Sequence, residues 1–241
     1  MLWTFLALLL GGILKGATGA GAPIIAVPVM AILVNVPFAI AILSVPNLVS
    51  NLWQGWQHRA DHLDLRFTVK FALAGAFGAA LGTYMLANLP DEALLVGVAI
   101  SVFAYIAFRL ARPHWVLPFA AAQRLALPVG TVAGMLQGAA GVSAPVSITF
   151  LNALRTDRSA FVATISAFFA AMAVVQIPLL TLYGFLTWER FLWSCVAIVP
   201  LAAGMPIGAA LARRISKEIF DKVILALLAL VALRLLSDAV L

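Results

Sequence analysis

The feature that most constrains this chain is an eight-residue pattern, G-A-x-G-x-x-A-P, which occurs twice without a gap. The copies cover residues 16–23 and 138–145, so 138 minus 16 and 145 minus 23 both give an offset of 122. The same offset relates identical residues outside the pattern, namely Gly12 with Gly134, Ser44 with Ser166, and Gln54 with Gln176. We therefore interpret the chain as a tandem repeat whose halves share one order of elements.

The composition places this repeat in a membrane. Hydrophobic residues make up 64% of the chain and charged residues 10%, whereas a soluble domain has about half and about a quarter. Uncharged runs reach or approach the roughly 20 residues that cross a bilayer; they cover 16–58, 125–154, 159–188 and 191–212. Because none alternates like a barrel strand, the spans are predicted to be helices. The fold class expected is an all-α polytopic membrane protein in contact with the lipid bilayer.

Each half is predicted to begin with a broken, re-entrant helical hairpin followed by three transmembrane helices. The first hairpin covers 2–15 and 22–35, and its legs of about 14 residues are short for full spans. The predicted helices then cover 38–57, 67–88 and 93–108 in the first half, and 125–137, 143–154, 159–182, 190–212 and 219–236 in the second. The domains expected are an N-terminal repeat (1–112), a cytoplasmic linker (113–124) and a C-terminal repeat (125–241). We expect the first apolar helix to be retained and not cleaved as a signal peptide.

The loop charges predict how the helices cross the membrane. Four segments carry ten of the fifteen Lys and Arg residues and are expected in the cytoplasm; these residues are Arg59, Arg66, Arg109, Arg112, Arg124, Arg155, Arg158, Arg213, Arg214 and Lys217. The net charge of +6 is thereby explained by membrane orientation, and no nucleic-acid partner is expected. Three full spans per half is an odd number, so the halves should insert in opposite orientations as an inverted-topology repeat.

The two glycine motifs can form an anion site. A helix that breaks at glycines leaves backbone N–H groups unpaired, which lipid does not satisfy. The half-helix restarting near Pro23 or Pro145 directs the positive end of its dipole at the gap. Two such ends, one from each half, would cradle an anion.

The charged residues favour the same substrate class. All nine Asp and Glu residues fall in loops or at helix ends, so no carboxylate is expected to carry a cation or proton through a span. Lys15 is the charge deepest in an apolar run, and its repeat mate is the neutral Gln137. Lys15 is interpreted either as a substrate-binding cation or as a lysine that reaches the interface or pairs with backbone carbonyls.

Helix 38–57 adds a polar face of Ser44, Asn47, Asn51 and Gln54, spaced for one side of a helix. These residues are interpreted either as part of the site or as hydrogen bonds between helices. The candidate substrate-binding residues are Lys15, Gly16, Thr18, Gly19, Gly21, Asn47, Asn51, Gln54, Gln137, Gly138, Gly141, Ser143 and Gln176. His58, Asp61 and His62 form a weak metal pattern without an evident fourth ligand. We expect no metal, no cofactor and no catalytic residues.

The motifs resemble those of the sulfite exporter TauE/SafE family, whose halves each begin with an apolar helix, a glycine-rich break and a proline. Here the pattern G-x-x-x-G-x-x-G-x-G-A-P starts at Gly12, and G-x-x-x-G-x-x-G-x-S-A-P starts at Gly134. The resemblance covers nearly the whole chain, which departs from the family pattern at Ala22, Ser143, Ala144 and Phe150. It implies a multi-pass permease of the bacterial inner membrane for sulfite, sulfonates or related organosulfur anions, driven by the proton motive force.

The function expected is therefore a secondary transporter for small sulfur-containing anions. Alternating access would take place around a midplane site between the two glycine breaks. An anion channel, a non-transporting scaffold subunit and a membrane-embedded enzyme using residues 58–62 are the alternatives. Protons are the expected coupling partner only if Lys15 or the substrate carries them. Homodimerisation stays open at this point.

Overall fold

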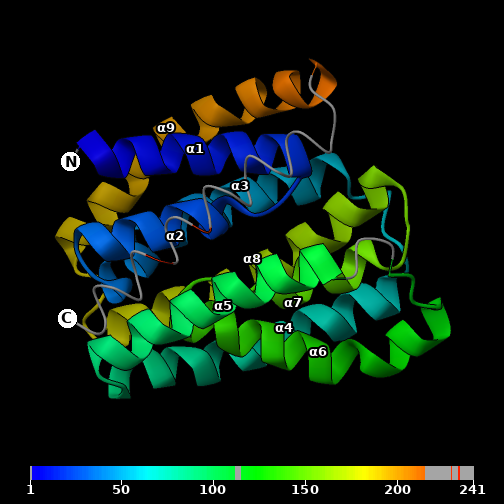
Figure 1. The fold of residues 1–241 in the computed structure, drawn as a ribbon, viewed down its shortest axis with the longest axis horizontal. Coiled ribbons are helices and arrows are strands. Elements are labelled where there is room, and N and C mark those ends of the chain that lie inside the picture. The colour runs from blue at the N-terminus through cyan, green and yellow to red at the C-terminus, as the bar shows by residue number, and fades with distance from the viewer. Residues whose placement is uncertain (1, 112–114, 215–228, 230–232, 234–241) are drawn as a thin grey trace.

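The computed structural model describes residues 2–111, 115–214, 229 and 233. Within these residues the regular secondary structure is entirely helical. All the helices run roughly along one direction, which is horizontal in Figure 1. They are α1 (Leu2–Thr18), α2 (Ala22–Leu33), α3 (Val36–Gln57), α4 (Leu65–Asn88), α5 (Asp91–Ala111), α6 (Phe119–Ala140), α7 (Ala144–Asn152), α8 (Arg158–Leu182) and α9 (Trp188–Arg214).

These helices confirm the predicted all-α class, and most begin and end within a few residues of their predicted bounds. The prediction for α6 was wrong, because that helix starts at Phe119 and is 22 residues long instead of covering only 125–137. Arg124 had been assigned to a loop, but its exposed side chain lies in the second turn of the helix, where a long cation can reach water. The predicted helix 219–236 lies outside the described residues except for positions 229 and 233.

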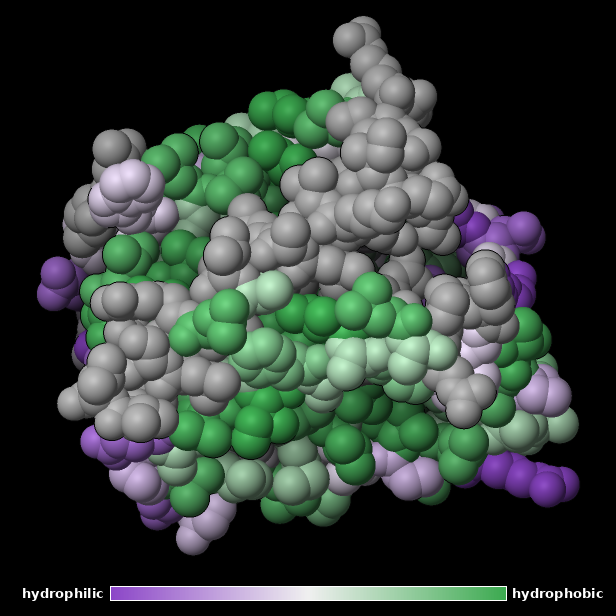
Figure 2. Space-filling model, in the orientation of Figure 1, coloured by the Kyte–Doolittle hydropathy of each residue, from purple (hydrophilic) through white to green (hydrophobic). Residues whose placement is uncertain are grey.

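Six of the described helices, α3, α4, α5, α6, α8 and α9, are long and apolar enough to cross a bilayer. Figure 2 shows apolar residues across the middle of the visible face and hydrophilic residues towards its left and right edges. A bilayer requires this distribution, because its hydrocarbon core excludes charged side chains. The chain is a multi-pass membrane protein.

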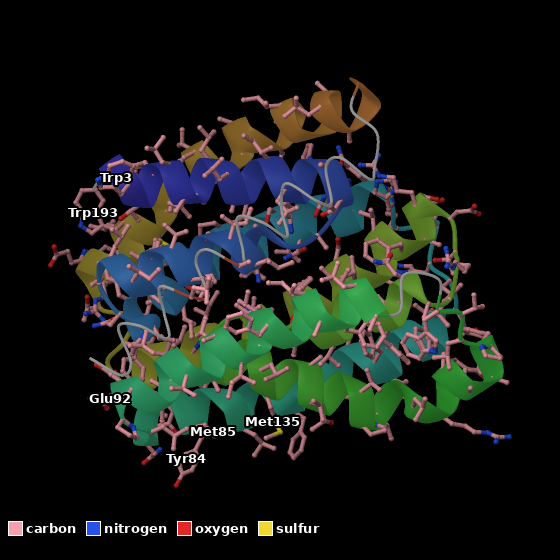
Figure 3. The ribbon with its side chains drawn as sticks, in the orientation of Figure 1. Trp3, Tyr84, Met85, Glu92, Met135 and Trp193 are labelled. Atoms are coloured by element: carbon pink, nitrogen blue, oxygen red, sulfur yellow. The ribbon has the colours of Figure 1, made fainter. Side chains whose placement is uncertain are left out.

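The loops lie at two ends that differ in charge. The right end in Figure 1 holds the loop between α3 and α4, the loop between α7 and α8, and the end of α9. Arg59 and Arg155 lie in these loops, so the positive-inside rule predicts that this end is cytoplasmic. Figure 3 labels Trp3, Trp193 and Glu92 at the opposite end. The two tryptophans are exposed there, as expected for the interface belt.

The two halves are interwoven. Helix α1 packs on α9, and its repeat mate α6 packs on α4. At both crossings the backbones touch: a Cβ added to Gly12 would overlap the carbonyl oxygen of Leu201, and one added to Gly134 would overlap that of Gly75. Gly12 and Gly134 are repeat mates. The small-residue patterns in these helices therefore mark close helix packing, as membrane interfaces commonly use.

Helices α3 and α8 pack on each other between these two pairs. Within α3, Pro46 has no N–H and leaves the carbonyl of Ile42 without its helical donor. Ser194 of α9 supplies one, because its Oγ donates to Ile42 O at 2.8 Å and accepts from the N–H of Val45 at 3.3 Å. A proline inside a helix is expected to bend it, and at Pro46 the neighbouring helix α9 supplies the missing hydrogen bond. α3 and α8 form the support on which the turns of both hairpins rest.

Candidate functional site

Both hairpins break at a left-handed glycine that directly follows the first helix, and the first hairpin has a second left-handed glycine where the other has the right-handed Ser143. Between α1 and α2, Gly19 and Gly21 have φ of 84° and 96°; between α6 and α7, Gly141 has φ of 69°. These left-handed values are accessible to glycine at little cost. α2 and α7 then restart with a proline in the first turn. The sequence prediction of broken helices at both motifs is confirmed.

Each tip contacts α3 or α8 of the other half at an equivalent position. A Cβ at Gly19 would lie 2.6 Å from Cγ2 of Val162 in α8, and one at Gly141 would lie 2.9 Å from Cγ1 of Ile40 in α3. Val162 and Ile40 are themselves 122 residues apart. The glycines therefore serve two purposes here, since they permit the turn and leave space for the facing helix.

Lys15 lies at the C-terminal end of α1, beside the first break. Its side chain is 1% exposed, and its Nζ donates to Oδ1 of Asn51 in α3 at 2.7 Å. Among the described residues the single ion pair joins His58 and Asp61, so none of the described carboxylates pairs with Lys15. A buried ammonium with one neutral partner is costly, and an anion nearby would offset that cost.

Asn51 extends this contact towards the middle of α3. Its Nδ2 donates to the backbone oxygen of Asn47 at 2.7 Å and to the Oδ1 of Asn47 at 2.8 Å. Asn47 lies near the centre of α3, one helical turn from Asn51. Lys15, Asn51 and Asn47 therefore form one continuous chain of hydrogen bonds that runs from the first break to the middle of the membrane-spanning helix.

This chain ends at a pocket beside the second break. Residues of α2, α3, α6 and α8 and the glycine of the break itself line the pocket; they are Pro23, Val27, Ile40, Leu43, Ser44, Asn47, Gln137, Gly141, Ala173 and Gln176. Four of the predicted site residues, Asn47, Gln137, Gly141 and Gln176, thus meet in one place. The free space is about that of a single water molecule.

The polar groups of this pocket are incompletely paired. Oε1 of Gln137 is buried and has no hydrogen-bond partner among the described residues. Nε2 of Gln176 makes only long contacts, at 3.4 Å to the backbone oxygen of Gln137 and 3.5 Å to that of Gly138. Buried polar groups are usually satisfied, so unpaired ones in a pocket indicate a place where a polar ligand or water binds.

The positions 122 residues away from the pocket residues form a second set around the first break. This set includes Lys15, Gly19, Asn51, Gln54 and Ser166. Oε1 of Gln54 and Oγ of Ser166 are buried without described partners, and α3 meets α8 there, because a Cβ on Gly55 would lie 3.8 Å from the Cβ of Ser166. The two breaks therefore carry related polar sets, and only the first set contains a charge.

Other predicted site residues occupy structural positions. Gly16 faces the backbone of Met205 in α9, and Gly138 faces that of Ala79 in α4, both at helix crossings. Thr18 Oγ1 contacts the backbone oxygens of Leu14 and Ala20 within the tip. Ser143 is buried and its backbone oxygen accepts from Ser147 Oγ at 3.0 Å. Gly21 faces side chains of Ile24 and Ile148.

Sequence reasoning missed one contact at the first tip. The exposed Arg158, at the start of α8, donates to the backbone oxygens of Gly16 at 3.2 Å and Ala17 at 3.4 Å. A cation here satisfies carbonyls at the end of α1, as is common at helix C-termini. No sequence pattern linked Arg158 to this tip, because the partners are 142 residues apart and the acceptors are backbone atoms.

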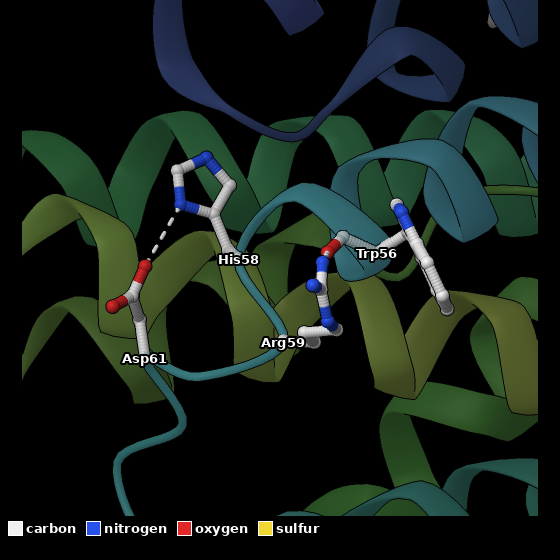
Figure 4. Close-up of polar contacts among 4 residues, drawn as sticks. All are labelled: Trp56, His58, Arg59 and Asp61. Carbon is white, nitrogen blue, oxygen red and sulfur yellow. Dashed lines mark hydrogen bonds and ion pairs between the residues drawn. The ribbon is translucent and has the colours of Figure 1, made fainter.

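The loop considered for a metal has a different arrangement. Figure 4 shows His58 turned towards Asp61, with Nδ1 and Oδ2 3.2 Å apart, and Arg59 beside Trp56. The guanidinium of Arg59 lies 4.5 Å from the centre of the Trp56 ring. Throughout the described residues, no three His, Cys, Asp or Glu side chains gather in a way that could hold a metal ion. The loop has the exposed ion pair and cation–π contact of a solvated surface.

The family model described as Sulfite exporter TauE/SafE matches residues 4–235, which is nearly the whole chain. No curated protein and no solved structure matches the chain. The chain therefore belongs to the sulfite exporter TauE/SafE family, a family of integral membrane transporters and not of enzymes.

Proposed function

We propose that this family member is a secondary carrier for a small sulfur-containing anion, such as sulfite or an organosulfonate. The substrate would bind between the two glycine breaks and be exposed alternately to the two sides of the membrane. The observation that carries the proposal is Lys15, a buried cation with a neutral partner, connected by hydrogen bonds to a polar pocket at the other break.

The electrostatics of the site favour an anion. Lys15, when protonated, supplies a positive charge in a region of low dielectric, where charge interactions are stronger than in water. α2 and α7 each add the positive end of a helix dipole at a break. The only polar groups that face these features in the described pocket are neutral hydroxyl and amide side chains, Ser44, Asn47, Gln137 and Gln176.

The size of the pocket favours a carrier over an open channel. Space for about one water molecule is too small for an anion with three oxygens. Binding therefore requires the hairpins and the α3–α8 pair to separate, and closure around the substrate would occlude it.

Equivalent helices pack in equivalent pairs in the two halves, which supports a mechanism in which the halves interchange their conformations. α1 on α9 corresponds to α6 on α4 under the repeat, and α3 on α9 corresponds to α8 on α4. Halves that insert in opposite orientations can interchange their conformations and so open a central site first to one side and then to the other. We propose on this basis that the two repeats, expected at 1–112 and 125–241, are inverted. Because α6 begins at Phe119, the second repeat starts with that helix and the segment that joins the repeats is shorter than the expected 113–124.

Cysteine accessibility tests the inversion. In a Cys195→Ser background, single cysteines replace Pro90 and Ile215. These positions are equivalent because the repeat register slips beyond Gln54, where an offset of 125 relates Arg109 to Arg234. An impermeant thiol reagent added to intact cells should label position 90 and spare position 215 until the membrane is opened. Labelling of both from the same side would contradict the inverted topology.

Flux into proteoliposomes tests the function. The panel is sulfite, thiosulfate, sulfate, a two-carbon sulfonate and acetate, each with and without a pH gradient. Saturable flux of a sulfur anion is expected, and a dependence on the gradient would show that Lys15 or the substrate carries a proton, since none of the described spans contains an interior carboxylate. Non-saturating flux would indicate a channel. Absence of flux for every anion would contradict the proposal and favour a scaffold role.

A further inference from the structure

The hydrogen bonds of Lys15 determine which way two amide groups face. A protonated lysine has donors and no acceptor, so in that form the atom of Asn51 at 2.7 Å from Nζ is its oxygen. The other end of that amide is then Nδ2, which has only donors. It is satisfied by two oxygens of Asn47, the backbone oxygen and Oδ1.

The same reasoning orients Asn47. Because its Oδ1 accepts from Asn51, the group of Asn47 left for the pocket is Nδ2 with its two N–H donors. Among the described residues Nδ2 of Asn47 makes no hydrogen bond, although the residue is mostly buried and lines the pocket.

The rest of the pocket shows why this orientation matters. The hydroxyl of Ser44 donates to the backbone oxygen of Ala41 at 2.8 Å, so it offers only lone pairs to a ligand. Oε1 of Gln137 is an unpaired acceptor. If the amide of Asn47 were reversed, its oxygen would add a third acceptor and repel an anion. With the orientation set by Lys15, the pocket instead offers two donors at its centre.

We propose that Asn47 is a specificity-determining residue that presents its Nδ2 donors to the transported anion, and that Lys15 acts as a positioning residue for it through Asn51. This inference rests on the proposed function and names the group that recognises the charge of the substrate in the pocket beside the second break. Through Asn51, Lys15 thereby favours the binding of an anion at Asn47, one helical turn from Asn51. Lys15 does not contact the anion at that position.

Binding of sulfite by purified protein tests the inference, measured as the rise of the unfolding midpoint against matched concentrations of sodium chloride. The variants are Asn47→Ala, which removes the donors while Asn51 keeps the backbone oxygen of residue 47, and Asn51→Asp. Aspartate at 51 can still accept from Lys15 but cannot donate to Asn47, so the amide of Asn47 is released and the lysine charge is neutralised. Asn88→Asp, at the exposed end of α4, is the matched control.

We expect the apparent affinity for sulfite to fall about tenfold or more in Asn47→Ala and in Asn51→Asp, since a hydrogen bond to a charged group contributes roughly 1.5–3 kcal/mol. The double variant should be no weaker than Asn51→Asp alone, because both changes act on one donor. Asn88→Asp should match the parent protein. The unfolding midpoints without sulfite show whether each variant is folded, and Asn47→Ser replaces Asn47→Ala if the latter is not.

The outcomes separate this inference from the proposed function. Sulfite binding by the parent that persists in Asn47→Ala would overturn the role of Asn47 and leave the carrier proposal standing. Loss of binding in Asn47→Ala together with full binding in Asn51→Asp would overturn the positioning role of Lys15. A parent protein that binds neither sulfite nor any other anion of the flux panel would overturn both.

Discussion

The two glycine breaks have the same eight-residue pattern and a left-handed glycine at the same position, Gly19 or Gly141, but they differ in charge. The first places Lys15 beside Asn51, whereas the second places the neutral Gln137 at the equivalent position beside a pocket. The left-handed turn after the first helix is therefore common to both breaks, and side-chain chemistry is specific to each. Duplication of a turn needs only its glycines, but an anion needs one net positive charge, and a second buried lysine would add another desolvation cost.

The shared geometry predicts equal and large effects at the two helix crossings. We expect Gly12→Val and Gly134→Val each to prevent stable folding or to destabilise by more than about 3 kcal/mol, because the added atoms would overlap a backbone carbonyl that cannot move aside. Unfolding midpoints and the yield of folded protein in detergent measure this. Gly97→Ala is the control, since nothing lies within 4 Å of its Cβ position, and should be neutral or stabilising. A stable fold in only one of the two variants, Gly12→Val or Gly134→Val, would show that the two helix crossings are not equivalent.

The difference in charge predicts an unequal effect on transport. Lys15→Gln makes the first break resemble the second, and we expect the kcat/KM for the transported anion to fall about 100-fold, the result of losing roughly 3 kcal/mol of charged hydrogen bonding. Lys70→Gln is the matched control, because Lys70 is half-buried outside the site and donates to the backbone oxygen of Gln123. Initial rates in proteoliposomes give the comparison. An unchanged rate in Lys15→Gln would remove this residue from the site.

Substitutions at the turns refine the comparison at a smaller scale. Gly19→Ala and Gly141→Ala should each destabilise by about 1–2 kcal/mol or more, because both impose a left-handed residue with a side chain and both press on the facing helix. Gly184→Ala has the same positive φ with nothing within 4 Å, so it measures the backbone cost alone. Chemical or thermal unfolding in detergent is the readout. Equal losses of stability in all three variants would show that the contacts with Val162 and Ile40 do not contribute to stability.

The smallest expected effect concerns the bend at Pro46, which exists only in the first half because its repeat mate is Phe168. Ser194→Ala leaves the carbonyl of Ile42 unpaired in the membrane, and we expect a loss of about 1–2 kcal/mol. Ser101→Ala should cost less, because that hydroxyl bonds the helical carbonyl of Gly97, which helix α5 already satisfies. Unfolding midpoints of Ser194→Ala and Ser101→Ala, each compared with the parent protein, test whether the first variant loses more stability than the second.

Much of the fold could be predicted because membrane helices follow from local composition. Long uncharged runs and glycine breaks predicted nearly every described helix, and the loop arginines predicted which loops share an end. The prediction for α6 was wrong since Arg124 was assigned to a loop, although a long side chain can reach water from within a helix. The predicted site was less complete: the sequence singled out Lys15, Asn51 and Asn47 separately, without any indication that they form one chain.

Sequence patterns could not predict which residues of distant segments contact each other. Gly16 and Gly138 belong to the motif, but the structure places them against α9 and α4, where backbone packing accounts for them. Arg158 reaches the first tip through backbone carbonyls that any residue would provide. Contacts of these kinds depend on how the helices are arranged in three dimensions, and backbone acceptors have no signature in a sequence.

The amino-acid sequence by itself determined the membrane environment, the repeat, the two helix breaks and the burial of one lysine among neutral neighbours. These properties depend on hydrophobicity, on glycine and proline, and on the position of charge along a helix, all of which are local. Only the tertiary structure decided that each first helix packs on the fourth helix of the other half. It also decided that Lys15 orients Asn47 through Asn51, because hydrogen-bond direction depends on which atoms of distant segments meet.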